Sequence, residues 1–196
     1  MLAAARGQSL PAREVPTSIK VEEEDDSLPF APTHMLAVYS PRDWAIGGRR
    51  AVRYVPIHDV VLAAHCTNLP ALPPRNPSPT SIAVTSLRLP ETTTFGVVLD
   101  YLYTKNVTTV LGALLPRSAV GVPAKAIPAT IAKACSTAEL TQRLFRTHAL
   151  WTNVCALGVH DEALWNIIDS AWQVLLLGLR ISSEAGGPVN VAPLKT

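Results

Sequence analysis

Two stretches of this chain run from a β-like entry directly into a helix with one apolar face, and they constrain the fold more than any other feature. The first is VPIHDVVLAAHCTNL at 55–69, and the second is LRLPETTTFGVVLDYLYT at 87–104. In the second, Phe95, Val98, Leu99 and Leu102 recur at i, i+3, i+4 and i+7, the spacing of one buried helix face. Short strands that alternate with helices predict a mixed fold.

The rest of the chain supplies the other elements of that fold. Residues 35–39 and 51–55 predict two antiparallel strands, and 81–89 predict a third. Helices are predicted at 58–66, 91–104 and 107–114, and two longer ones follow 136 and 161. Ser136 and Glu139 have the spacing of a capping box. We therefore expect an α+β domain with a small sheet of about three strands and a cluster of about five helices.

The two long helices have apolar stripes that predict which side chains are buried. For the first, the stripe is Leu140, Leu144, Trp151 and Cys155. For the second, the stripe is Leu164, Ile167, Ile168, Ala171, Trp172, Leu175, Leu176 and Leu179. Its window at 164–181 still contains polar and charged residues, so we expect a core helix and no membrane span.

Composition shifts set the expected boundaries. Residues 1–33 hold prolines and an acidic run with little apolar periodicity, so we expect a disordered tail. The interaction domain is expected at 34–182, with an internal loop at 116–135 that is rich in proline and small residues. A flexible tail is expected at 183–196.

One motif in the N-terminal segment indicates a covalent modification. Ile19, Lys20, Val21 and Glu22 match the apolar-Lys-x-Glu acceptor for the small ubiquitin-like modifier, and four more acids follow. The lysine would supply the amine, and the acids would attract the conjugating enzyme. The alternative is a chance lysine beside a solvated acidic run, and the sequence leaves both interpretations open.

Catalytic and cofactor motifs are not found in the sequence. It contains neither G-x-G-x-x-G nor GxxxxGK, and its five histidines do not have metal-site spacing. His58 and Cys66 are eight residues apart, too far for a hydrogen bond along one helix. We expect His58 to enter the helix and bond nearby backbone. The net charge of +2 does not favour binding to nucleic acid. We therefore predict no enzyme activity, no cofactor and no metal.

The order of strands and helices resembles the BTB/POZ fold. In that family an HxxVLAA helix follows the second strand and an F..LLdYlYT helix follows the third; here HDVVLAA at 58–64 and 95–104 match them. The resemblance covers about 35–115, with the closing helices to 181. The residues that we take to define the fold are His58, Leu62, Phe95, Tyr101 and Trp172. By analogy with this fold alone, a homodimer is an open alternative.

A closer resemblance is carried by longer stretches, namely VYSPRDW (38–44), VPIHDVVLAAHCTNLPALP (55–73), LRLPETTTF (87–95), DYLYT (100–104) and ALGVHDEALWNIIDSAWQVL (156–175). These are similar to the clampless family of basidiomycete fungi. The resemblance implies a regulator of sexual development, needed for clamp-cell formation and dikaryon maintenance, that is nuclear or nucleocytoplasmic and acts through transcription-factor partners. The alternative is a BTB-type substrate adaptor that binds a cullin ubiquitin ligase near 104–106.

Overall fold

The computed structural model describes residues 7–11, 16–20, 31–41, 49–74 and 81–185. The chain divides into two compact units. Unit 1 is Met1–Lys105 together with Ala149–Asp161, and unit 2 is Asn106–His148 together with Glu162–Thr196. We expected one interaction domain at 34–182, so the division differs from that expectation. The α+β class itself is confirmed.

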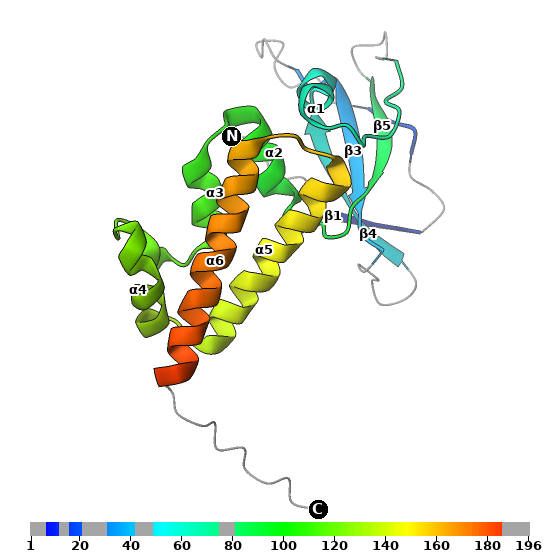
Figure 1. The fold of residues 1–196 in the computed structure, drawn as a ribbon. Helices are drawn as coiled ribbons and strands as arrows, with labels where there is room; N and C mark the ends of the chain where they lie inside the picture. The colour runs from blue at the N-terminus through cyan, green and yellow to red at the C-terminus, as the bar shows by residue number, and fades with distance from the viewer. Residues whose placement is uncertain (1–6, 12–15, 21–30, 42–48, 75–80, 186–196) are drawn as a thin grey trace, which may run out of the picture. The chain divides into compact units, whose positions relative to one another are not determined.

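Unit 1 is built on a sheet of five strands in the order β1-β4-β3-β5-β2 (Figure 1). The three strands expected from the sequence form its centre: β3 (His34–Tyr39), β4 (Arg49–Ile57) and β5 (Ser81–Arg88). β3 pairs antiparallel with β4, as predicted, and parallel with β5. Central strands buried on both faces fit these apolar sequences, since Leu36, Ala37 and Val38 are all at most 1% exposed.

Two further strands lie in the N-terminal segment that we expected to be disordered. β1 (Gly7–Pro11) pairs antiparallel with β4, and β2 (Ser18–Lys20) pairs antiparallel with β5. Neither strand carries the alternating apolar pattern that would have indicated it. Edge strands need only backbone hydrogen bonds on one side, so they form with little sequence signal.

Two helices of unit 1 follow the strands as the sequence indicates. α1 (Asp59–His65) follows β4, and α2 (Phe95–Thr104) follows β5. All four residues of the predicted α2 face are buried, and so is Tyr101. Strand β4 continues through Pro56 to Ile57, beyond the strand predicted at 51–55. The α2 face is therefore the most accurate part of the sequence prediction.

Unit 2 contains α3 (Val107–Leu114), the 3-10 turns η1 (Arg117–Ala119) and η2 (Ala124–Ala126), α4 (Ile127–Ala134) and α6 (Glu162–Ala185). The expected loop at 116–135 is thus wrong over α4, which packs along α6 (Figure 1). Pro128 stands in the first turn of α4, where its missing N–H costs no helical bond. A cluster of buried residues joins η1, α4, the helical segment at 140–144 and α6: Ala119, Ile131, Leu140, Leu144 and Leu175.

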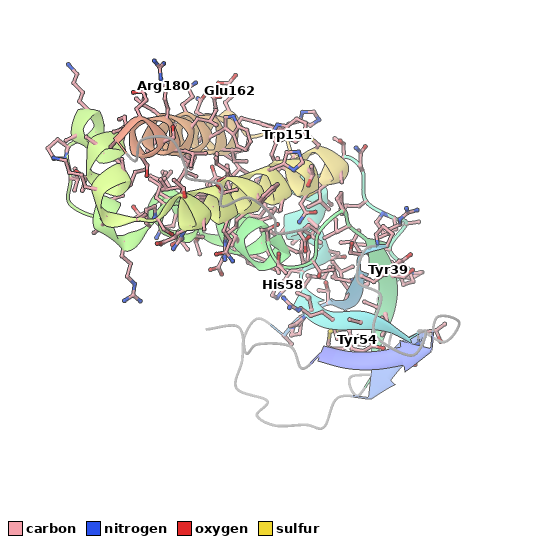
Figure 2. The ribbon with its side chains drawn as sticks, turned by 90° about the horizontal axis from the view of Figure 1, so that it is seen from below. Tyr39, Tyr54, His58, Trp151, Glu162 and Arg180 are labelled. Atoms are coloured by element: carbon pink, nitrogen blue, oxygen red, sulfur yellow. The ribbon has the colours of Figure 1, made fainter. Side chains whose placement is uncertain are left out.

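Helix α5 (Thr137–Leu157) belongs to unit 2 up to His148 and to unit 1 from Ala149 on. Leu140, Leu144 and Thr147 are buried in the unit 2 part, whereas Leu150, Asn153, Val154 and Leu157 are buried in the unit 1 part. Trp151 is 45% exposed and Cys155 is exposed, so the predicted stripe is wrong after Leu144 (Figure 2).

The capping box predicted at the start of α5 is present, whereas α6 ends later than predicted. The N–H of Glu139 donates to the hydroxyl of Ser136 at 3.2 Å, as a capping box requires. Gly158, at φ +63°, ends α5 in the left-handed conformation. α6 continues to Ala185, into the tail that was expected at 183–196. None of the described helices is long and apolar enough to span a membrane.

Candidate functional site

His58 is held by the phenol of Tyr103, which lies on α2. The His58 N–H donates to that hydroxyl at 2.8 Å, and the ring Nδ1 lies 2.9 Å from it. The two rings meet edge to face at 5.7 Å. His58 stands at the start of α1, as predicted, and its ring also joins that start to the end of α2. Local sequence pattern does not indicate this second contact, because the partner lies 45 positions away.

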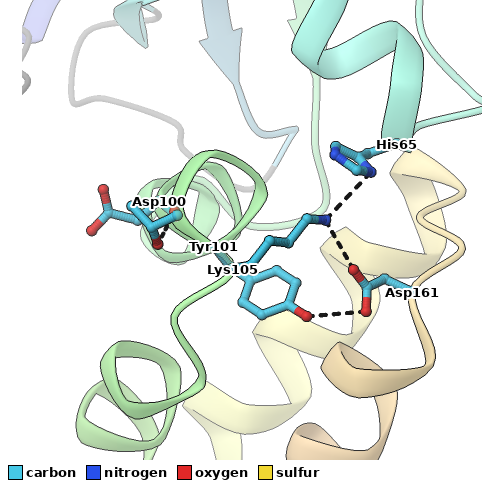
Figure 3. A network of polar contacts seen from close by, with 6 residues as sticks. His65, Asp100, Tyr101, Lys105 and Asp161 are labelled. Atoms are coloured by element: carbon cyan, nitrogen blue, oxygen red, sulfur yellow. Dashed lines mark hydrogen bonds and ion pairs between the residues drawn. The ribbon is translucent and has the colours of Figure 1, made fainter.

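A second polar network joins α1, α2 and the segment after α5 (Figure 3). The Tyr101 hydroxyl donates to Asp161 Oδ1 at 3.0 Å. Lys105 Nζ donates to Asp161 Oδ2 at 2.9 Å and lies 3.3 Å from His65 Nδ1. All four residues belong to unit 1. This network fixes the C-terminal end of α2, where Lys105 adopts a left-handed φ of 53°.

Burial and the polar network together raise the pKa of Tyr101. Burial is the largest cause that raises its pKa, to about 12, and the hydrogen bond to Asp161 and the negative charge of that carboxylate raise it further. The side chain is only 2% exposed. The ammonium of Lys105 also lies 5.2 Å from the centre of the Tyr101 ring, a cation–π distance. Tyr101 therefore acts as a neutral hydrogen-bond donor between helices.

Asn153 is the polar residue that the sequence reasoning missed. It is fully buried, its Oδ1 accepts the N–H of Glu91 at 3.1 Å, and its Nδ2 donates to the Glu91 carbonyl and to Thr94 Oγ1. Thr94 is the residue at the start of α2, and its side chain makes no cap bond of its own. Asn153 thus anchors the start of α2 to α5. The stripe predicted for this helix does not include position 153, so the apolar pattern did not indicate the anchor.

The other residues that we predicted to define the fold or to be modified lie on different elements. Leu62 is 0% exposed on α1, and Phe95 is 2% exposed on α2. Trp172 is partly buried against the apolar cluster of unit 2. Ile19 and Lys20 belong to β2, while Val21 and Glu22 lie outside the described residues. The role of Lys20 as a modification site stays a prediction.

The chemistry of Cys66 is that of a core thiol. It is 6% exposed, and burial raises its pKa to about 11 against a smaller lowering by Lys105. A thiol with a raised pKa is protonated at neutral pH, which makes it a poor nucleophile. Among the described residues, no group of three or more His, Cys, Asp or Glu side chains could hold a metal ion. The polar groups described here join one element to another.

A groove of about 510 Å³ runs between α1 and the proline-rich segment that follows it. Its lining comprises Asp59, Val60, Ala63, Cys66, Thr67, Leu69, Pro70, Leu72, Pro73 and Pro74. Hydrogen bonds hold the segment in place: His34 Nε2 lies 2.9 Å from the Pro73 carbonyl, and Thr67 Oγ1 donates to the Gly158 carbonyl at 3.1 Å. The N–H groups of Thr67 and Asn68 also donate to the carbonyls of Gly158 and Leu157. Val60 is 68% exposed at the groove. The groove is thus a preformed surface whose lining is polar and apolar in equal parts.

Two models of known protein families match the chain. A model of the Clampless protein 1 N-terminal domain matches residues 2–99, and a model of the Clampless protein 1 C-terminal domain matches residues 108–194. No curated protein and no solved structure matches the chain. The break between the two matched domains brackets the point after Lys105 where the chain first passes from unit 1 to unit 2.

Fold and site together define a mixed α+β protein in which buried polar side chains join helices and a preformed groove lies at the surface. The chain belongs to the clampless family. Membership in that family indicates a role in clamp-cell formation, as a developmental regulator. The resemblance of the core to the BTB/POZ fold stays a prediction.

Proposed function

We propose that the chain regulates fungal sexual development, including dikaryon maintenance, as a non-enzymatic protein that binds transcription factors in the nucleus or between nucleus and cytoplasm. The observation that carries the proposal is the groove beside α1. It presents Val60, Ala63, Leu69 and Leu72 together with three prolines, on a segment that is already fixed by hydrogen bonds. A preformed surface that carries exposed apolar side chains binds a partner with little ordering cost.

The chemistry of the site supports binding over catalysis. The thiol of Cys66 is buried with a raised pKa, and the His58 ring is engaged by Tyr103. Tyr101 and Asp161 are tied to each other and to Lys105. Groups fully engaged in holding helices together are poor candidates for general acid or base work, which needs a group within reach of substrate.

The occupant that fits the groove is a short apolar segment of a transcription-factor partner. Apolar side chains of such a segment would be desolvated against the leucines and prolines of the groove. The exposed γ-methyl groups of Val60 would then contribute directly, because they are in water in the free chain.

The test is affinity purification of the tagged chain from mating cells, with two variants of α1 compared. Val60→Asp places a charge on the groove, whereas Ala64→Asp adds the same charge on an exposed position of α1 that does not line it. We expect the wild type and Ala64→Asp to recover transcription factors and Val60→Asp to lose them. Equal recovery by both variants would remove the groove from the proposal, and recovery of no transcription factor by the wild type would reject it.

The cullin adaptor is the second candidate, and one observation favours it. Thr104, Lys105 and Asn106 are all exposed, so the segment that the BTB/POZ resemblance assigns to cullin binding is accessible. The same purification distinguishes the two functions. A cullin recovered with the wild-type chain and lost on Asn106→Asp would favour the adaptor. Homodimerisation is tested in the same experiment, because a homodimer would recover a second, differently tagged copy of the chain.

Lys20 adds a separate proposal, that this lysine is conjugated to the small ubiquitin-like modifier. The sequence motif supports it, and Lys20 lies on β2, an extended strand at the end of the sheet. Lys20→Arg keeps the charge and removes the acceptor amine. We expect the variant to lose a slower-migrating form in fungal extracts, and persistence of that form in the variant would show that the motif is inert.

A further inference from the structure

The outer edge of β5 is covered along only part of its length. β2 pairs with Ser81, Ile82 and Ala83, while β5 itself runs on to Arg88. On the inner edge, by contrast, β3 pairs with β5 continuously from Ala83 to Arg88. Among the described residues, no strand pairs with the outer edge beyond the bond that joins the Val84 N–H to the Thr17 carbonyl.

The direction of the backbone groups on this edge follows from two hydrogen bonds. The N–H of Val84 donates to Thr17 on the outer side, and the N–H of Leu89 donates to Tyr39 on the inner side. Because successive N–H groups of a strand alternate, those of Ser86 and Arg88 point outward like that of Val84. Both residues are exposed. The outer edge thus presents the backbone N–H and C=O groups of Ser86 and Arg88 to a further strand.

Pairing between β2 and β5 is continued at one end by the bond from the Val84 N–H to the Thr17 carbonyl. At its other end, β2 reaches Ser81, the first residue of β5. Among the described residues, β2 therefore covers only the first half of β5.

A small cavity lies at the C-terminal end of the same strand. Its volume is about 360 Å³, and it is lined by Pro41, Arg88, Leu89, Pro90 and Ala156. Four of these residues offer apolar surface, and the fifth is an exposed arginine. In the part of the chain that the structure describes, no acidic side chain forms an ion pair with Arg88.

We propose that the open half of the β5 edge is a peptide-docking site, which takes an extended acidic segment of a partner protein by strand addition. The backbone of the segment pairs with Ser86 and Arg88, one carboxylate pairs with the guanidinium of Arg88, and one apolar side chain enters the cavity beside Leu89 and Pro90. Main-chain bonds supply affinity in this mode of recognition, and the charge and the pocket supply sequence preference. The inference rests on the proposed function and names a second surface by which the regulator holds partners.

A displayed library of random eight-residue peptides, selected against the full chain, tests this inference. We expect the selected peptides to carry an acid and a nearby apolar residue. Binding of synthetic copies is then measured to the wild type and to three variants. Ser86→Pro removes an outward N–H and leaves the β3 ladder intact, and Ser86→Ala is its matched control. Arg88→Glu reverses the charge.

The expected result is a loss of at least about tenfold in affinity for Ser86→Pro and for Arg88→Glu, with less than about twofold change for Ser86→Ala. Exchange of the Ser86 and Arg88 amide protons should slow in the complex. Arg88→Glu keeps the test decisive if proline at Ser86 lowers the thermal midpoint. Selection of no peptide, equal binding to the wild type and Arg88→Glu, or unchanged exchange at Ser86 and Arg88 would each overturn the inference.

These outcomes separate the inference from the proposed function. If the wild-type chain recovers transcription factors while no peptide protects the β5 edge, the edge proposal fails and the regulator function stands. If neither the groove nor the edge recovers a partner, the proposed function fails with it. Binding that releases the Ile82 and Val84 amides would mean that the peptide displaces β2, which contradicts docking on the open half.

Discussion

The buried amide of Asn153 gives the sharpest quantitative test of this structure. Asn153→Ala removes three hydrogen bonds at a site that is 0% exposed: one from the Glu91 N–H, one to the Glu91 carbonyl and one to Thr94 Oγ1. Each bond contributes about 1 kcal/mol net. The truncation also leaves the buried hydroxyl of Thr94 short of a partner, at a further cost of about 1 kcal/mol or more. We expect a total loss of about 3–5 kcal/mol.

The assay is urea unfolding followed by circular dichroism, with amide exchange of Val97 and Val98 as a local readout. Both amides donate to the Thr94 carbonyl, so they report on the first turn of α2. The control is Asn166→Ala, the same chemical change at an exposed position of α6, which should alter stability by less than about 0.5 kcal/mol. If Asn153→Ala lost no more than this control, the anchoring role would be refuted.

Three further substitutions test separate parts of the structure. For Tyr101, the folded pKa of about 12 lies above the ordinary value of 10.0, so the stabilising contribution is complete below pH 10 and is lost as the pH rises from 10 to 12. Tyr101→Phe should flatten that alkaline loss, of roughly 2 to 3 kcal/mol, in unfolding curves recorded at several pH values; an unaltered pH profile would contradict it. Gly158→Ala places alanine in a left-handed φ and brings a methyl group against Thr67 and Asn68, so the thermal midpoint of this variant should fall. The control is Gly96→Ala in α2, where the methyl group meets nothing within 4 Å, and the thermal midpoint should stay the same or rise. Leu99→Ala, at 4% exposure, should cost about 2–5 kcal/mol in urea unfolding, and a smaller cost would place Leu99 outside the core.

Leu176 shows where a helix stripe over-predicts burial. The α6 stripe is correct for Leu164, Ile167, Ile168, Ala171 and Leu175, all of which are buried. Leu176 lies next to Leu175 on the helix and is 43% exposed. A run of three leucines at 175–177 is wider than one face, because adjacent residues point about 100° apart. The periodicity located the helix and its central line, but it could not tell which edge of the stripe meets a neighbour.

The elements that the sequence missed share a physical cause. The strands β1 and β2 are held by backbone pairing at sheet edges, which leaves little trace in side-chain pattern. Helix α4 begins at Ile127 with Pro128 in its first turn, so a proline that usually indicates a loop here starts a helix. Its buried Ile131 packs against Gly178 of α6, where an added Cβ would lie 2.7 Å from the isoleucine. Such close packing depends on a partner 47 residues later in the chain, which local reasoning does not include.

The polar anchors were equally hidden, and for a reason that bears on function. His58, Tyr101 and Asp161 each find their partner on another element of unit 1, so their roles emerge only when the chain is folded. The same histidine and cysteine that first suggested chemistry are engaged or buried, and what stays available is backbone and apolar surface: the groove beside α1 and the open half of β5. A regulator that binds partners through such surfaces needs a rigid frame behind them, because any freedom in α1 or β5 would be lost on binding and would weaken affinity. The helix-joining network supplies that rigidity. Substitutions in the network should therefore lower both the stability of the fold and the affinity for a partner in the groove, although no network residue lines the groove. Val60→Asp should lower that affinity while the stability of the fold stays unchanged.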